Sequence, residues 1–97
     1  MPAFIILGNF TEQGVRSVKD TTKRAEKFKE IAKQHGATVK DVYWTLGQYD
    51  VVSIVEAPDV TSVTALGLSL GMSGNVRTQT LPAFSVDDMA KVLAKVK

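Results

Sequence analysis

The 97-residue sequence contains no cysteine, which excludes a disulfide scaffold, a thiol nucleophile and a cysteine-ligated zinc or iron–sulfur site. His35 is the only histidine, so a metal site that needs two histidines from one chain is excluded as well. No apolar run approaches the length of about eighteen residues that a membrane-spanning helix needs, and no basic segment precedes the short apolar stretch near the start. We therefore expect a cytoplasmic protein with no metal, no other cofactor and no membrane contact.

Hydrophobic residues make up 44% of the chain and charged residues 23%, proportions that are typical of a folded domain and not of a disordered segment. This length predicts one domain, residues 1–97, with a single core. In a small chain without disulfides, hydrophobic burial and the entropy of ordering nearly cancel. We therefore expect contact with a second subunit to contribute to the stability of the fold.

The spacing of apolar residues predicts the element order βαββαβ, followed by a terminal helix. The predicted strands are residues 3–10, 39–46, 51–57 and 75–83, and the predicted helices are residues 15–35, 59–72 and 86–96. This order is that of the α+β, ferredoxin-like fold, in which an antiparallel sheet with strand order 4-1-3-2 carries both crossover helices on one face.

The first predicted strand is apolar on both sides, because Phe4 and Ile6 alternate with Ile5 and Leu7. One set faces the helices, and the other lies on the open face of the sheet. An apolar open face needs a cover, and a second copy of the same sheet is the simplest one. We expect a homodimer formed sheet to sheet, with larger rings as a further option, and the uncharged segment 60–76 to be partly covered.

The segment Gly47-Gln48-Tyr49-Asp50 joins the two strands of the predicted hairpin. Together with the segments 56–59 and 74–84, it resembles the small bacterial GYD-domain family, whose Gly-x-Tyr-Asp signature is matched by Gly47, Tyr49 and Asp50. The resemblance covers almost the whole chain. It implies a ferredoxin-like fold of the dimeric α/β-barrel type, and it brings no established reaction or ligand.

Two interpretations of the signature residues stay open. In the first, Gly47 adopts a positive φ in a shaped turn and Asp50 accepts backbone hydrogen bonds. In the second, Asp50 and the hydroxyl of Tyr49 lie at the mouth of a cleft as acid–base and orienting groups. His35 likewise either binds a carbonyl group at its helix end or serves as a general base or haem ligand facing a cavity.

The basic residues of the first helix alternate with Asp20, Glu26 and Glu30, which favours a solvated surface over a phosphate-binding one. No RNP1-like string occurs, so we expect no nucleic-acid partner. The basic residues assigned to this solvated surface are Arg16, Lys19, Lys23, Arg24, Lys27, Lys29 and Lys33.

Arg77 is the only Arg or Lys between Lys40 and Lys91. A strand arginine reaches either solvent or a carboxylate, so an ion pair within the sheet or across a dimer is the first interpretation. If no carboxylate is within reach, an anionic ligand becomes its natural partner.

Three functions are compatible with these observations. The first is a binding or regulatory module that holds a small, partly apolar molecule between sheet and helices. The second is a cofactor-independent oxygenase or isomerase acting on a small aromatic or acidic substrate, and the third is an assembly protein without a ligand. A void near Tyr43 and Trp44 supports the first two, and convergence of His35 or Asp50 on that void favours the enzyme. The expected ligand-binding residues are Asn9, Tyr43, Trp44, Tyr49 and Arg77, and the catalytic candidates are His35, Tyr43 and Asp50, with Arg77 as a further residue for the enzyme.

Overall fold

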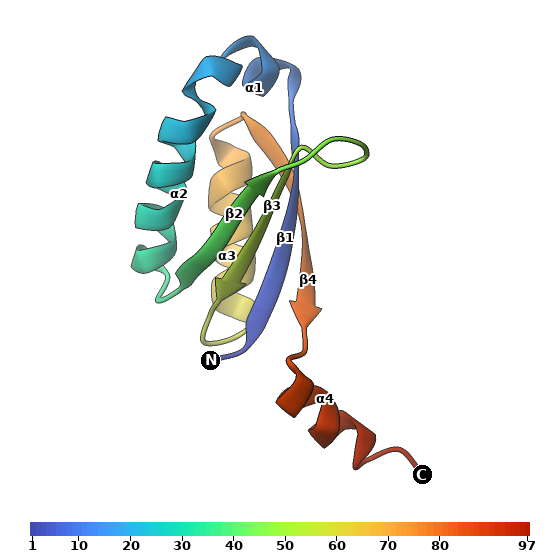
Figure 1. Ribbon diagram of the computed structural model, residues 1–97. Helices are drawn as coiled ribbons and strands as arrows, with labels where there is room; N and C mark the ends of the chain where they lie inside the picture. Colours follow the sequence, from blue (N-terminus) through green and yellow to red (C-terminus); the bar gives the residue numbers. More distant parts are fainter.

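Four antiparallel strands form one sheet in the computed structural model, which describes residues 1–97 (Figure 1). Their order across the sheet is β2-β3-β1-β4, which is the predicted 4-1-3-2 order seen from the other edge. The sheet topology and the α+β, ferredoxin-like fold are therefore confirmed. The strands are β1 (Ala3–Phe10), β2 (Thr38–Trp44), β3 (Val51–Glu56) and β4 (Val76–Ala83).

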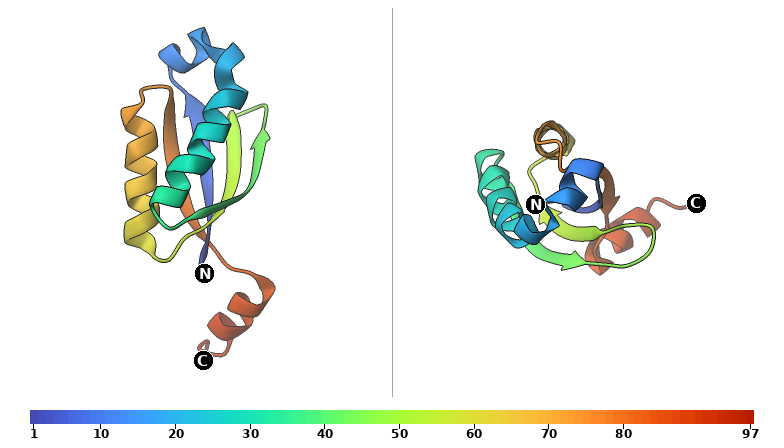
Figure 2. Two further views of the ribbon diagram at one scale, coloured as in Figure 1. Left: turned by 90° about the vertical axis from the view of Figure 1, so that its left-hand side faces the viewer. Right: turned by 90° about the horizontal axis from the view of Figure 1, so that it is seen from above.

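The two long helices lie on the same side of the sheet (Figure 2). They are α2 (Thr21–Gln34) and α3 (Val60–Met72), and each connects two strands. Two shorter helical segments, α1 (Glu12–Arg16) and the 3-10 turn η1 (Val18–Asp20), lead from β1 into α2. None of the helices has the length and apolar character required to cross a membrane.

The helix predicted for residues 15–35 is interrupted, and this part of the prediction is wrong. The side chain of Thr11 accepts a hydrogen bond from a backbone N–H of the first turn, so α1 begins before the predicted start. Ser17 leaves the helical region with φ −110° and ψ 30°, which ends α1 and leads into the 3-10 turn. As a result, Val15 and Val18 are exposed and do not extend the apolar face of α2.

The core lies between the sheet and the pair of long helices. Alternation along β1 works as predicted, since Phe4 and Ile6 are buried under the helices while Ile5 and Leu7 on the other side are half-buried. The other core residues are Phe28, Ala32, Ala37, Val55, Ala57, Val63 and Leu66. One face of the sheet is therefore covered within the chain and the other is not.

The last helix, α4 (Val86–Leu93), projects from the end of β4 away from the sheet (Figure 1). A capping box begins this helix, because Ser85 and Asp88 exchange hydrogen bonds between side chain and backbone. No residue of α4 is buried. Pro82 lies in β4, an edge strand, where its missing N–H leaves no gap inside the sheet.

Candidate functional site

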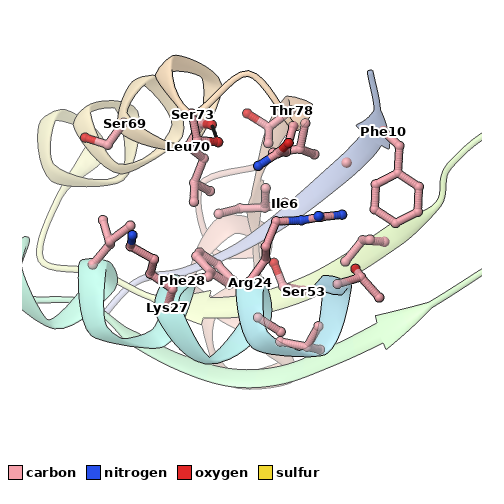
Figure 3. Close-up of a pocket in the computed structure, with 18 of the residues that line it drawn as sticks. Ile6, Phe10, Arg24, Lys27, Phe28, Ser53, Ser69, Leu70, Ser73 and Thr78 are labelled. Atoms are coloured by element: carbon pink, nitrogen blue, oxygen red, sulfur yellow. Dashed lines mark hydrogen bonds between the residues drawn. The ribbon is translucent and has the colours of Figure 1, made fainter. Parts of the chain in front are cut away.

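A cavity of about 270 Å³ lies between the sheet and the two long helices (Figure 3). It occupies the end of the sheet where β1 and β2 finish and where β3 and β4 begin. The apolar part of its wall includes Ile6, Phe10, Phe28, Val42, Trp44 and Leu70, and the polar part includes Arg24, Lys27, Ser53, Ser73, Asn75 and Thr78. No histidine or carboxylate lines this cavity.

Small residues in the sheet make room for the cavity. Gly8 of β1 contributes no side chain, and Ser53 of β3 contributes only a short one, whereas the neighbouring layer of the core is filled by Phe4 and Val55. A Cβ atom added to Gly8 would lie 3.0 Å from the Cγ2 atom of Val76, so a larger residue would close this space. The void therefore results from the size of the residues in β1 and β3.

Trp44 forms one wall of the cavity. Its indole Nε1–H donates to the hydroxyl of Thr21 over 3.0 Å, which ties the end of β2 to the start of α2. Tyr43 lies on the opposite side of β2, where 58% of its surface is exposed. The expected void is therefore found beside Trp44, but Tyr43 does not reach it.

Arg24 is half-buried in the cavity wall and extends from α2 toward the ring of Phe10 (Figure 3). The centre of its guanidinium lies 5.9 Å from the ring centroid, within the range of a cation–π interaction. Its Nη1 donates to the carbonyl of Ser17 at 2.8 Å and to the Ser17 hydroxyl at 3.1 Å, and its Nη2 donates to the carbonyl of Gly14 at 3.2 Å. Arg24 thereby holds the segment between β1 and α2 against the cavity.

The catalytic candidates do not meet at the cavity. His35 follows the last turn of α2, where its Nδ1 lies 3.0 Å from the carbonyl oxygen of Ile31. Asp50 lies just before β3, and its Oδ2 accepts a hydrogen bond of 2.9 Å from the backbone N–H of Phe10. Neither side chain lines the cavity, and with Tyr43 on the open face the three groups occupy three different places.

Most of the other expected ligand-binding residues lie on the open face of the sheet. Asn9 and Arg77 are direct partners in the pairing of β1 with β4, and Gln79 lies two residues farther along the same edge. The hydroxyl of Tyr49 donates to Oε1 of Gln79 over 3.0 Å. Asn9, Tyr49 and Arg77 therefore gather at one corner, while Tyr43 lies across the sheet from them on β2.

Arg77 forms no ion pair within the chain. The two ion pairs present, Arg16 with Glu12 and Lys29 with Glu26, are both on exposed helix surfaces. An ion pair of Arg77 with a carboxylate of its own sheet is thus not formed. Its guanidinium is left exposed on the open face.

Comparison with known protein families gives a match to the GYD domain over residues 4–93. The chain belongs to the GYD domain family. A relative from Thermus thermophilus is 38% identical over 90 residues, which cover 92% of this chain and 95% of the relative. That protein is named glutamine synthetase and cystathionine beta-lyase binding protein. No solved structure matches the chain.

In this GYD domain, the signature residues shape the loop between β2 and β3. Gly47 has a φ of 105°, a conformation that residues with a side chain rarely adopt. The hydroxyl of Thr45 donates to the carbonyl of Tyr49 over 2.6 Å, and the backbone N–H of Asp50 donates to the carbonyl of Gly8 over 2.9 Å. The loop is therefore fixed to β1 by Asp50 and to β4 by Tyr49, and the turn interpretation describes its geometry.

Arg24 and Gly8 are two cavity residues that the sequence pattern does not single out as site residues. The sequence pattern assigns Arg24 to the solvated basic surface, yet it is spaced three residues after Thr21 and four before Phe28, on the face of α2 that turns toward the sheet. A charged residue on the sheet-facing side of α2 is the sequence feature that could have indicated a role for Arg24 in the site. Gly8 is visible as a glycine in the middle of an apolar strand, a position that often marks a close approach or a missing side chain.

Proposed function

We propose that this GYD domain is a cytoplasmic regulatory binding protein that acts as a homodimer and docks on metabolic enzymes of the two kinds named for its Thermus relative. The observation that carries this proposal is the similarity to that relative over nearly the full length of both chains. A binding surface of the relative would then lie in the same small fold, with no additional domain to supply it. A catalytic role has less support, because His35, Tyr43 and Asp50 lie in three separate places.

The open face of the sheet supports the homodimer. Its centre consists of Ile5, Leu7, Val52 and Ile54, which lie side by side across β1 and β3. These side chains are only half-buried in the single chain. Covering them with the same face of a second copy removes apolar area from water on both partners, which is the main driving force of association.

Charged groups on the same face are arranged to suit such a dimer. Arg77 is on β4 at one edge of the sheet, and Asp41 is on β2 at the other edge. In a two-fold symmetric pairing of sheets, one edge of each copy can approach the opposite edge of the other. Arg77 would then find in the second copy the carboxylate partner that its own chain does not supply.

The cavity supports the regulatory part of the proposal. Its apolar walls and few polar groups are typical of sites that hold a small, partly apolar molecule. It lies on the helix side of the sheet, so a bound molecule would not compete with the sheet-to-sheet dimer. We propose that occupation of this cavity adjusts how strongly the domain docks on its enzyme.

A binding measurement with purified proteins tests the proposal. Glutamine synthetase and cystathionine beta-lyase from the source organism are immobilised separately, and this domain is titrated over each surface. We expect saturable binding in the micromolar range or tighter to at least one enzyme, together with a change in the kcat or KM of that enzyme in solution. Absence of binding to both enzymes would overturn the docking proposal, and sedimentation of the domain as a monomer at micromolar concentration would overturn the homodimer.

A further inference from the structure

Cations without a counter-charge line the cavity. Arg24 and Lys27 both contribute to its wall, and no Asp or Glu does so. Neither cation takes part in an ion pair in this chain, and Arg24 is half-buried among apolar groups. A positive charge that is partly removed from water gains most from an anion placed beside it.

Arg24 also retains unused donors. A guanidinium carries five N–H groups. Its Nη1 donates to the carbonyl and hydroxyl of Ser17, and one N–H of its Nη2 donates to the carbonyl of Gly14. The Nε–H and one Nη2–H have no acceptor in the chain, and they are two donors of the kind to which a carboxylate binds with its two oxygens.

The existing hydrogen bonds hold Arg24 in place before any ligand arrives. They come from the segment that leads from β1 to α2, and this segment is itself fixed to the start of β4, because the backbone N–H of Thr11 donates to the carbonyl of Asn75 over 3.1 Å. Gly14 packs so closely there that an added Cβ would lie 2.0 Å from the carbonyl oxygen of Asn75. A fixed cation loses little freedom on binding, which favours affinity.

The rest of the cavity suits an apolar body. Ile6, Phe28 and Leu70 line it from the sheet and from both long helices. Its volume of about 270 Å³ is close to the lower end of the range for small-molecule sites, about 300 to 1,000 Å³. A ligand here is therefore small, with room for one ring or a short branched chain besides its polar group.

We propose that this cavity binds a small apolar or aromatic monocarboxylate, whose carboxylate group accepts hydrogen bonds from Arg24 and whose body lies against Ile6, Phe28 and Trp44. This inference rests on the proposed regulatory role of the cavity and adds the chemical class of the ligand. The alternative is that Arg24 only fastens the segment before α2. That alternative predicts no preference for a charged ligand over a neutral one.

The single tryptophan provides the measurement. Trp44 is the only tryptophan of the chain and lines the cavity, so its fluorescence reports binding there. Phenylacetate is titrated into the wild-type protein and compared with phenylacetamide, which has the same shape without the charge. We expect a saturable signal with phenylacetate and affinity weaker by at least about tenfold for phenylacetamide, because a bidentate charged contact is lost.

Variants of the two cavity cations complete the test. Arg24→Met is expected to weaken phenylacetate binding by at least about tenfold, and Lys27→Met, the matched control, by less. Equal affinity for the acid and the amide, or no binding of phenylacetate, would overturn the inference, and neither result depends on a variant that folds. Unchanged affinity in a folded Arg24→Met protein would overturn it as well.

The enzyme-docking experiment separates this inference from the proposed function. It is carried out without phenylacetate, so docking with no phenylacetate binding would refute the ligand class alone. Conversely, phenylacetate binding through Arg24 without docking on either enzyme would refute the docking proposal and leave the ligand class standing.

Discussion

The two faces of the sheet carry similar residues but have different surroundings. On one face, Phe4 and Val55 are almost completely buried beneath α2 and α3. On the other, Ile5 and Ile54 are just as apolar but only half-buried. The difference arises from topology, because both crossover helices pack on the same side of a ferredoxin-like sheet. An apolar sequence therefore marks both faces of the sheet as suited to burial, and the chain's connections decide which face is covered within the chain.

The largest expected effect is on the covered face. Leu66 of α3 is completely buried, so Leu66→Ala should lower the free energy of unfolding by about 2–5 kcal/mol through lost burial and a residual cavity. Leu68 lies in the same helix with 67% of its surface exposed, which makes Leu68→Ala the matched control, with a change within about 0.5 kcal/mol. Urea denaturation monitored by circular dichroism measures both. Equal losses for the two variants would contradict this description of the core.

The next effect concerns the open face. Leu7→Asp places a carboxylate at the centre of the proposed dimer, where its desolvation should raise the dissociation constant by about a hundredfold or more. Sedimentation velocity should show monomers, while the far-ultraviolet circular dichroism stays that of the folded domain. Thr64→Asp, on an exposed position of α3, is the control and should sediment as wild type does. A Leu7→Asp protein that remains dimeric would place the dimer contact elsewhere.

A smaller effect on stability is expected from Asp50, in the loop between β2 and β3, whose side chain binds the end of β1. Asp50→Ala removes the acceptor for the backbone N–H of Phe10, which should cost about 1–2 kcal/mol of stability. Asp50→Asn keeps an acceptor oxygen and should cost less. Thermal unfolding of the two variants measures the difference. An Asp50→Asn protein that is fully stable but binds the proposed enzyme partner more weakly than wild type would favour a functional role for the charge over the turn interpretation.

The sequence is sufficient for the sheet and insufficient for the site, for physical reasons. The strands are recognisable from local alternation, as Phe4 and Ile5 of β1 illustrate. Their order then follows from the rules for connecting strands through helices and hairpins. The break at Ser17 escapes prediction because Val15 and Val18 continue the helical spacing, and only the capping of α1 overrides it. The role of Arg24 depends on the approach of Phe10 and of the segment before α2, contacts that bring separate elements together and that no local pattern encodes.

The smallest expected effect is a change in the pH dependence of stability, and it differs between α3, which packs on the sheet, and α4, which projects from it. Hydrogen bonds from the backbone and side chain of Ser62 hold the pKa of Asp59, the N-cap of α3, below its ordinary value of 3.8. Because the folded pKa is depressed, this contribution to stability is present at neutral pH and is lost as the pH falls through the folded pKa. Asp59→Asn should therefore flatten the dependence of stability on pH below about pH 5.

Asp88, whose pKa is lowered by hydrogen bonds with Ser85 at the start of α4, gives the matched case. Since no residue of α4 is buried, its protonation should reduce the helicity of α4 and leave global unfolding unchanged. Urea midpoints of wild type and Asp59→Asn, measured across acid pH, test the prediction for Asp59. Amide chemical shifts of residues 86–93 test the prediction for Asp88. Identical pH profiles for wild type and Asp59→Asn would show that the cap of α3 adds nothing to the stability of the covered face. Global destabilisation on protonation of Asp88 would show that α4 is packed against folded structure, as it would be if a second copy of the chain covered it.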